Sequence, residues 1–261
     1  MKKIFNEIQL QFIKNNYNNI TYKEMSKLEL FTGLTDKQIR TKAATMGLRK
    51  QRQFNKQYFK SINDSNKAYW LGFIYADGYI TYSNELGIEL QYSDKEHLEK
   101  LNELIGGVHK VTRRKRNQKF NGYEYVSDLA SLRIFSVDIV SDLLNSGIDF
   151  NKTKSSLFPR VDEKLFFQFL RGFMDGDGCI HINKKNRVVV SFTNSNVEFL
   201  NYISDEVYRQ IGVRGHIYKE KELKYRLQYL KKSDTKKLLD KIYEDKLCCK
   251  LDRKYDKYNV I

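Results

Sequence analysis

The first fifty residues contain three short stretches in which apolar residues recur at the spacing of an α-helix. These stretches predict helices over residues 7–15, 22–30 and 36–46. Thr21, with Glu24 three positions later, forms a capping box at the start of the second helix. Gly33 interrupts the chain before the third helix, and Gly47 ends that helix. Residues 1–50 are therefore predicted to form a small all-α domain.

The order of these helices resembles a helix-turn-helix domain, in which the last helix contacts DNA. Arg40 and Lys42 fall on the side of the third helix that faces solvent, so we expect them to bind DNA. An ordinary three-helix bundle is the alternative. The basic residues that follow predict a linker over residues 51–65.

The pattern beyond this linker occurs twice, one hundred residues apart. Tyr69–Gly78 reads YWLGFIYADG and Phe169–Gly178 reads FLRGFMDGDG, and each is apolar enough for a buried helix. The same order of elements follows each helix. Strands are predicted over residues 79–82, 87–92, 108–114, 124–134, 179–183, 187–193, 215–218 and 225–230, and helices over 95–105, 137–145, 197–211 and 234–245.

This repeat predicts an α+β fold of two αββαββα halves, residues 66–150 and 151–261. Each half contributes an antiparallel sheet, and the halves are expected to be related by a pseudo-twofold axis, as in a symmetric dimer. Because both halves lie in one chain, we expect a monomer.

The repeated helices carry small residues four positions apart, on one helix face. These residues are Gly72, Ala76, Gly172 and Gly176. Without side chains in the way, the two helices are expected to pack nearly backbone to backbone. Gly78 and Gly178 are expected to end them in the left-handed conformation.

One acid then remains in the last turn of each helix, Asp77 and Asp177. A carboxylate there opposes the helix dipole, and close packing brings the two carboxylates together. A bridging divalent cation would remove both penalties, and hard oxygen ligands beside a phosphate suit Mg²⁺. We therefore expect Asp77 and Asp177 to be metal ligands and catalytic residues; the alternative is a turn residue at each helix end.

Composition favours a nucleic-acid partner. The chain has 47 Lys and Arg against 32 Asp and Glu, a formal net charge of +15. No apolar stretch reaches the roughly 18 residues of a membrane span, so no membrane partner is expected. Cys179, Cys248 and Cys249 lack the spacing of a zinc site or a disulfide framework. We therefore expect reduced thiols and a cytoplasmic location.

The two repeated segments are similar to the motifs of single-chain LAGLIDADG homing endonucleases. The second copy is very close, whereas the first has Tyr75 where the pattern has its earlier acid. The later acid, which is the family's metal ligand, is present as Asp77 and Asp177. The resemblance implies a metal-dependent double-strand cut at a long asymmetric DNA site, with two antiparallel sheets in the major groove.

The resemblance also implies polar residues near the metal and basic residues along the sheets. Gln91 and Lys231 are expected to position the attacking water. DNA contacts are expected from Glu89, Gln91, Arg113, Arg114, Arg116, Arg133, Lys184, Lys185, Arg187, Arg226 and Gln228. Solvated surface charge is the alternative for each of these residues.

Two other functions remain open on the same scaffold. One is a DNA-binding regulator that does not cut, against which both Asp77 and Asp177 argue. The other is a maturase that binds intron RNA and assists splicing, because one basic surface can bind either polymer.

Overall fold

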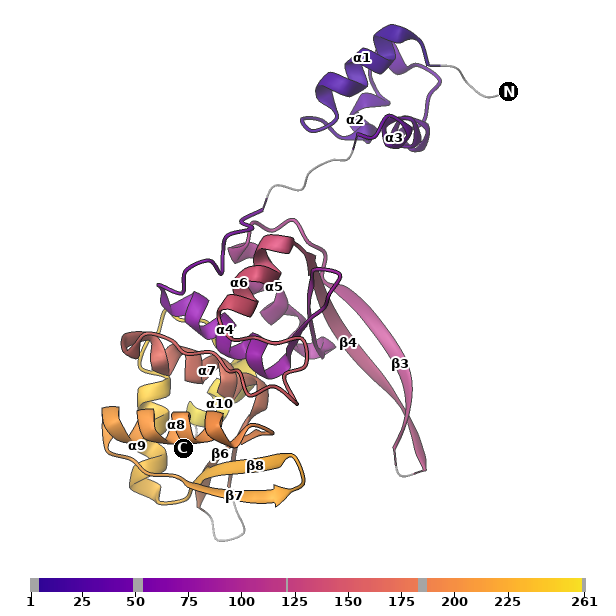
Figure 1. Cartoon of the computed structure of the whole chain (residues 1–261). Helices are drawn as coiled ribbons and strands as arrows, with labels where there is room; N and C mark the ends of the chain where they lie inside the picture. The colour runs from indigo at the N-terminus through magenta and orange to yellow at the C-terminus, as the bar shows by residue number, and fades with distance from the viewer. Residues whose placement is uncertain (1–4, 49–53, 121, 183–186, 260–261) are drawn as a thin grey trace. The chain divides into compact units, whose positions relative to one another are not determined.

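The computed structural model describes residues 5–48, 54–120, 122–182 and 187–259. The chain divides into two compact units, Met1–Gln53 and Phe54–Ile261. Figure 1 shows the helices of the first unit and the two sheets of the second. Each unit has its own hydrophobic core. Within the described residues, we find no helix that is long and apolar enough to cross a membrane.

The first unit contains α1 (Glu7–Asn16), α2 (Tyr22–Met25), the 3-10 helix η1 (Glu29–Phe31) and α3 (Asp36–Thr45). Each α-helix begins with a capping box, in which two orphan backbone groups are satisfied reciprocally. The core of the unit consists of Ile13, Met25, Phe31, Leu34, Ile39 and Ala43.

The second helix of this unit is shorter than the prediction over residues 22–30. It ends at Met25, and the Ser26 hydroxyl bonds back to Lys23 O at 2.8 Å. Leu28 is then extended, with φ −73° and ψ 141°, before η1 begins. Hydroxyl groups that bond to nearby carbonyls compete with helix continuation, which the apolar pattern does not reveal.

The second unit contains the two predicted halves in the predicted order. The first half comprises α4 (Ser65–Asp77), β1 (Gly78–Ile80), β2 (Glu85–Gln91), η2 (Tyr92–Asp94), α5 (Lys95–Leu104), β3 (Thr112–Phe120), β4 (Tyr123–Phe135) and α6 (Val137–Asn145). The second comprises η3 (Glu163–Leu165), α7 (Phe166–Asp177), β5 (Gly178–Ile182), β6 (Val188–Asn194), α8 (Val197–Ile211), β7 (His216–Lys221), β8 (Lys224–Tyr229) and α9 (Lys232–Ile242). A further helix that the sequence did not predict, α10 (Asp252–Asn259), follows α9.

Each half contributes one four-stranded antiparallel sheet. The strand orders are β1-β2-β4-β3 and β5-β6-β8-β7, which are equivalent in the two halves. Gly78 pairs with Ile88, and Gly178 pairs with Phe192, so the sheets begin in equivalent registers. These sheets and the repeated element order confirm the predicted α+β fold.

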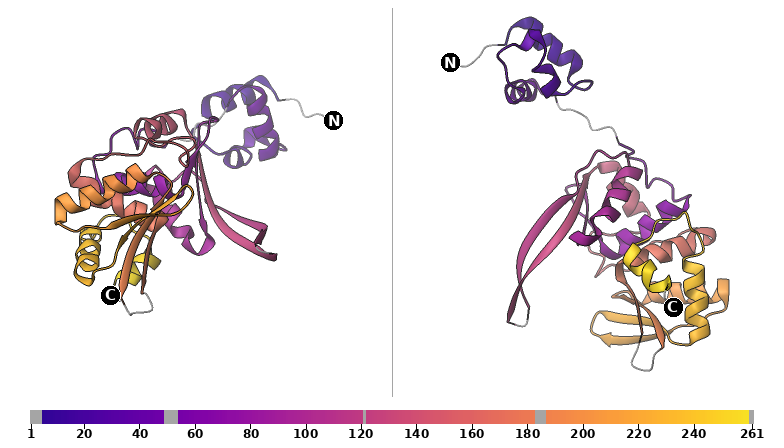
Figure 2. Two further views of the ribbon diagram at one scale, coloured as in Figure 1. Left: turned by 60° about the horizontal axis from the view of Figure 1, so that its bottom comes forward. Right: turned by 180° about the vertical axis from the view of Figure 1, so that it is seen from behind.

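The two sheets differ most in their second hairpins. In the first half, β3 and β4 are 9 and 13 residues long, whereas β7 and β8 have six residues each. Figure 2 shows the β3–β4 hairpin projecting far beyond the rest of its sheet. At about 3.3 Å per residue, β3 is roughly 30 Å long and β7 roughly 20 Å. The predicted strand over residues 108–114 therefore starts later and runs further than expected.

The predicted linker over residues 51–65 belongs in large part to the second unit. Residues 51–53 lie outside the described residues. Tyr58 and Phe59 are buried in the core of the second unit, and Asn55 N donates to Ile105 O at 2.8 Å. Charge alone suggested a linker here, but these two aromatic side chains bury enough apolar area to fix the segment.

Candidate active site between the repeated helices

Helices α4 and α7 pack against each other at the centre of the second unit, as Figure 1 shows. A Cβ atom built on Gly72 would overlap Phe169 O and lie 2.9 Å from Phe173 N. A Cβ atom built on Gly172 would likewise overlap Tyr69 O. The two helices therefore meet backbone to backbone, and glycine is required on both sides of the contact.

The same close approach continues to the last turn of each helix. A Cβ atom built on Gly176 would overlap the Ala76 Cβ and lie 3.3 Å from Asp77 Oδ2. The carboxyl group of Asp77 is thus adjacent to the last turn of α7, which ends in Asp177. All four small residues expected at the helix contact lie on it, and they bring the two acids together.

The glycines after the acids do not adopt the expected left-handed conformation. Gly78 has φ −80° and Gly178 has φ −81°, and each continues directly into a strand. A Cβ atom at Gly78 would lie 2.8 Å from Ile74 Cγ2, and one at Gly178 would lie 2.7 Å from Met174 Cα. Glycine is needed here because the strand turns closely over the helix end, not because of a positive φ.

The surroundings of the two acids disfavour negative charge. The pKa of Asp177 is raised to about 6, first by desolvation and then by Asp77. The pKa of Asp77 is also raised, again mainly by desolvation. Both side chains keep contact with solvent, but the helix ends and neighbouring segments displace much of their hydration. Among the described residues, neither carboxylate makes a hydrogen bond or an ion pair, so their oxygens are available to a ligand.

Two lysines that the sequence did not single out lie at the ends of these helices. Lys152 Nζ donates to Tyr75 O at 2.8 Å and to Ala76 O at 3.0 Å, and it also contacts Gly78 O. It occupies the C-terminus of α4, where helix carbonyls lack partners within the helix.

Lys254 makes the equivalent contacts at the end of α7. Its Nζ donates to Met174 O at 2.6 Å, to Gly178 O at 2.7 Å and to Gly176 O at 3.1 Å. An ammonium group has three N–H donors, and these three carbonyls account for all of them. Lys254 is therefore a fixed positive charge at the helix end, placed where the dipole favours a cation.

Each lysine acts on both acids. Among the charged neighbours, Lys254 lowers the pKa of Asp77 most, and Lys152 lowers that of Asp177 most. Desolvation lowers the pKa of each lysine to about 8. Because each acid depends on a lysine carried beside the other helix, the two acids and two lysines form one composite cluster.

Local sequence carries no signal for either lysine. Lys152 lies between α6 and α7, outside both motifs, and Lys254 lies in the unpredicted helix α10. The unpaired carbonyls at two helix ends and the two acids require nearby cations. With 47 Lys and Arg in the chain, that requirement does not identify which ones.

Among the described residues, no hydrogen bond or ion pair joins Gln91 or Lys231 to the two acids. Gln91 is exposed at the end of β2, three residues beyond Ile88, which pairs with Gly78. Lys231 precedes α9, is 77% exposed and pairs with Asp234 at 3.5 Å. That Gln91 and Lys231 position the attacking water stays a prediction.

The predicted DNA-contacting residues of the first half lie mostly on one sheet face. The register places Glu89, Gln91, Arg114, Arg116 and Arg133 on the face opposite the buried Ile88 and Leu90. Arg114 and Arg116 bond to Glu89 at 3.2 and 3.0 Å, and Arg133 pairs with Glu85. Arg113 falls on the other face, where it pairs with Asp128 and lies 4.2 Å from the Tyr92 ring.

The second sheet has fewer described candidates. Arg226 pairs with Glu220 at 2.9 Å, and Gln228 pairs in register with Ser191. Arg187 is exposed just before β6. Lys184 and Lys185 lie outside the described residues. In the first unit, Arg40 on α3 is exposed and Lys42 is partly exposed.

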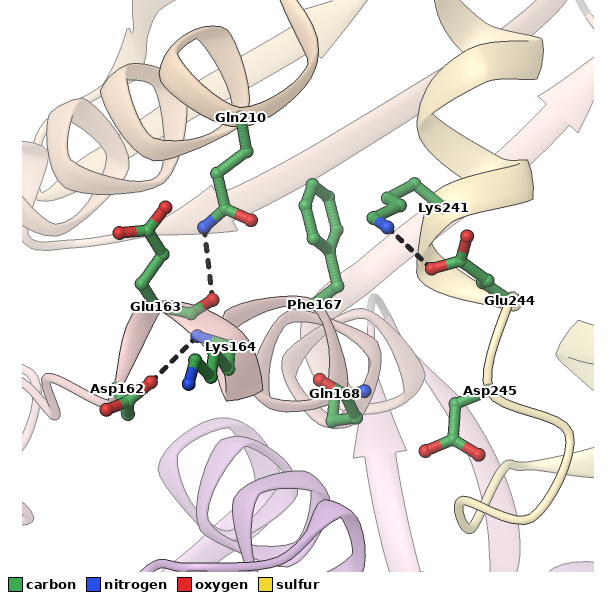
Figure 3. A pocket seen from close by; sticks show the side chains of 9 residues that line it. All are labelled: Asp162, Glu163, Lys164, Phe167, Gln168, Gln210, Lys241, Glu244 and Asp245. Atoms are coloured by element: carbon green, nitrogen blue, oxygen red, sulfur yellow. Dashed lines mark hydrogen bonds and ion pairs between the residues drawn. The ribbon is translucent and has the colours of Figure 1, made fainter.

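A pocket elsewhere on α7 is not part of this cluster. It is lined by Phe167 and Gln168 from the first turn of α7, with residues of both charges around them. Figure 3 shows Lys241 paired with Glu244 in this pocket, and Gln210 bonded to the backbone of Glu163. It lies at the opposite end of the helix from Asp177.

A divalent cation fits the donors at the helix ends. Asp77 and Asp177 offer unpaired carboxylate oxygens, and their raised pKa values reflect charge that a cation would offset. Among the described residues, no group of three or more His, Cys, Asp or Glu side chains could hold a metal. Two carboxylates completed by water and phosphate match the preference of Mg²⁺, not that of a zinc site.

Residues 64–143 and 166–243 each match the family described as LAGLIDADG-like domain. The two matches cover more than half of the chain, so the chain belongs to this family, with two copies of the domain in one polypeptide. The family resemblance inferred from the two motifs is thereby confirmed.

Individual proteins are similar to the chain at lower identity. The uncharacterised protein MJ0314 of Methanocaldococcus jannaschii is 26% identical over 175 residues, which cover 65% of this chain and 64% of that protein. The match thus spans just under two thirds of that relative's length. Among solved structures, the N-terminal LAGLIDADG domain of DUF199/WhiA has 16% identity and a TM-score of 0.47, covering 79% of this chain and 97% of that chain. I-DmoI in complex with DNA and Ca has 19% identity and a TM-score of 0.48, covering 79% and 100%.

Proposed function

We propose that the chain is a site-specific DNA endonuclease that makes a metal-dependent double-strand cut at a long asymmetric target. One observation carries this proposal: two unpaired acids with raised pKa values lie together at the ends of the two repeated helices, each flanked by a lysine that caps a helix end. A non-cutting DNA-binding protein has no use for such an electrostatically costly pair.

Within this proposal, Asp77 and Asp177 would hold a divalent cation, which would make a bound water more acidic and stabilise charge on the phosphate. Lys152 and Lys254 keep the two helix ends and their acids in place. Because their N–H groups are occupied by carbonyls, both act through their charge and not as proton donors. Having one such cluster between two sheets supports the cutting of both strands of a bound duplex.

The sheets and the first unit supply the DNA surface. Arg114, Arg116 and Arg133 are held in ordered positions by Glu89 and Glu85. Exposed ion pairs are worth only about 0–1 kcal/mol, so phosphates can replace the glutamates when DNA binds. The longer β3–β4 hairpin supports a target whose two halves differ in length.

The test is digestion of a supercoiled plasmid library that carries a randomised insert. With Mg²⁺, the protein is expected to linearise a subset of plasmids, and sequencing of the new ends gives the target. With EDTA in place of Mg²⁺, the library should stay supercoiled.

Binding without any nicking or linearisation, in Mg²⁺ and in Mn²⁺, would contradict the proposal and favour a DNA-binding regulator. Tight binding to intron RNA, together with neither binding nor cutting of any plasmid in the library, would favour the maturase alternative.

A further inference from the structure

Helix α7 buries two charged side chains one turn apart, Arg171 and Asp175, which are 1% and 0% exposed. The equivalent positions of α4 hold Leu71 and Tyr75. Burying charged groups is costly compared with apolar side chains of similar volume. Because α4 packs into the same contact with apolar residues, helix packing does not account for the charges on α7.

Arg171 binds the C-terminal segment, which we define as residues 242–255. Its Nε donates to Ile242 O at 2.7 Å, and its Nη1 donates to Asp245 O at 2.9 Å and to Cys248 O at 3.1 Å. One buried guanidinium therefore holds the end of α9 and two further points of the backbone that follows it, which makes no helix or strand of its own.

Asp175 binds the same segment three residues beyond Cys248. Leu251 N donates to Asp175 Oδ2 at 2.7 Å. Leu251 directly precedes α10, and Lys254 lies in the first turn of that helix. Asp175 thus fixes the backbone three residues before the lysine that occupies the end of α7.

A polar chain ties Asp175 to the first half as well. Tyr69 OH donates to Asp175 Oδ2 at 2.7 Å and lies 2.8 Å from His97 Nε2. The equivalent contacts in the other half are aromatic, because Phe199 packs on Phe169 and Tyr75 with ring centroids 6.3 and 4.6 Å apart. Of these two equivalent clusters, the hydrogen-bonded one is the cluster that contacts the C-terminal segment.

Connectivity explains why one lysine needs this support. The segment that carries Lys152 is continuous with α6 on one side and α7 on the other. Residues 243–251, which lead to Lys254, make no helix or strand and run from α9 into α10, outside the repeated elements, so side-chain hydrogen bonds hold them in place. Further bonds from the segment reach the first half, at Ser65 and Asn66.

We infer that Arg171 and Asp175 are positioning residues, which hold the C-terminal segment so that Lys254 stays at the active site. Their hydrogen bonds go to the C-terminal segment and to Tyr69, not to the two acids. The inference rests on the proposed function for its effect on cutting. Whether Arg171 and Asp175 hold the C-terminal segment in place can be measured without DNA.

The test compares Asp175→Ala with Asp175→Asn, which keeps an oxygen acceptor for Leu251 N. Asp142→Ala, which removes a partly buried carboxylate from α6, is the control. Each strand of the target duplex recovered from the plasmid library carries its own end label, and single-turnover rates are measured per strand. Lys254→Met and Lys152→Met serve as references for the strand that each lysine supports.

Asp175→Ala is expected to slow the same strand as Lys254→Met, by about 100-fold, the cost of a displacement near 1 Å. It should leave the other strand much less affected, so nicked plasmid accumulates. Asp175→Asn should restore the rate to within a few-fold. Equal slowing of both strands by Asp175→Ala, or slowing of the strand that Lys152→Met slows, would overturn the inference.

Hydrogen–deuterium exchange of the complete protein separates this inference from the proposed function. Asp175→Ala should raise exchange across residues 246–255, with the β-sheets unchanged, whether or not the protein cuts DNA. Unchanged exchange there would overturn the inference even if wild-type cutting is normal. Should Asp175→Ala not fold, Arg171→Gln tests the same fastening, with the same expected strand and the same expected peptides.

Discussion

In the first half of the second unit, Phe54–Ile261, which we call the core unit, the lysine at the helix end lies on the segment that connects α6 to α7. In the second half the lysine lies in α10, and buried polar groups of α7 hold the segment that leads to it. The helices, glycines and acids are nevertheless equivalent. The comparison teaches that the repeat is strict where backbones touch, and that the halves diverge where the chain connectivity differs.

The largest expected effect tests the contact between α4 and α7, where the two halves are equivalent. Gly72→Ala and Gly172→Ala should each destabilise the core unit by about 3 kcal/mol or more, because the added methyl meets backbone on the facing helix. Urea unfolding followed by circular dichroism measures this. Gly176→Ala is the matched comparison, with a smaller loss, because its methyl meets a side chain. If only one of Gly72 and Gly172 were sensitive, the halves would not share the contact.

A second prediction concerns His97, for which the other half has Phe199. Burial lowers the pKa of His97 to about 3. The unfolded chain therefore takes up a proton near pH 6.5 that the folded protein does not, and stability is lost as pH falls below 6.5. The loss should reach about 3 kcal/mol by pH 4.

His97→Phe should remove this loss. The measurement is the difference in unfolding free energy between wild type and variant from pH 8 to pH 4, in which the other titrating groups cancel. A difference that does not change with pH would show that His97 has the same pKa in the folded protein as in the unfolded chain.

A third prediction compares the two compact units. Removing residues 1–53 should weaken DNA affinity by about 10- to 100-fold, or 1.4 to 2.7 kcal/mol, and leave the core unit folded. Fluorescence anisotropy at fixed salt measures the affinity, and thermal unfolding checks the core. If the core unit unfolds or the affinity is unchanged, the first unit has a structural role instead.

The smallest expected effect concerns the ion pairs on the first sheet. Glu89→Gln should release Arg114 and Arg116 for phosphates and raise the affinity for non-specific DNA a few-fold. The gain should vanish at high salt. Glu244→Gln, on the far side of α7, serves as the control and should leave affinity unchanged. A loss of affinity in Glu89→Gln would mean that Glu89 itself contacts DNA.

The motif helices, the order of elements and the pair of acids could be predicted from sequence. Alternating and helix-spaced apolar residues report burial, and small residues four apart report close helix contact. These signals are local, and they occur twice. The hairpin lengths were less predictable, because β3 is a polar strand that the apolar pattern does not mark.

The lysines at the helix ends and the buried charges on α7 could not be predicted in this way. Lys152 and Lys254 act on helix ends more than seventy residues away in the chain, and nothing near them in sequence indicates it. Arg171 and Asp175 belong to a motif that sequence analysis interprets as an apolar helix face. Gln91 and Lys231 are expected at the site only through the family resemblance, and their role stays a prediction.

The claim at the centre of this account is that Asp77 and Asp177 form one composite catalytic site. The most direct measurement is cutting of the supercoiled target plasmid in Mg²⁺ by wild type, Asp77→Asn and Asp177→Asn, with DNA affinity measured alongside. The account predicts linear product from wild type, and uncut plasmid with undiminished affinity from both variants. Linear product from either variant at the wild-type rate would contradict it.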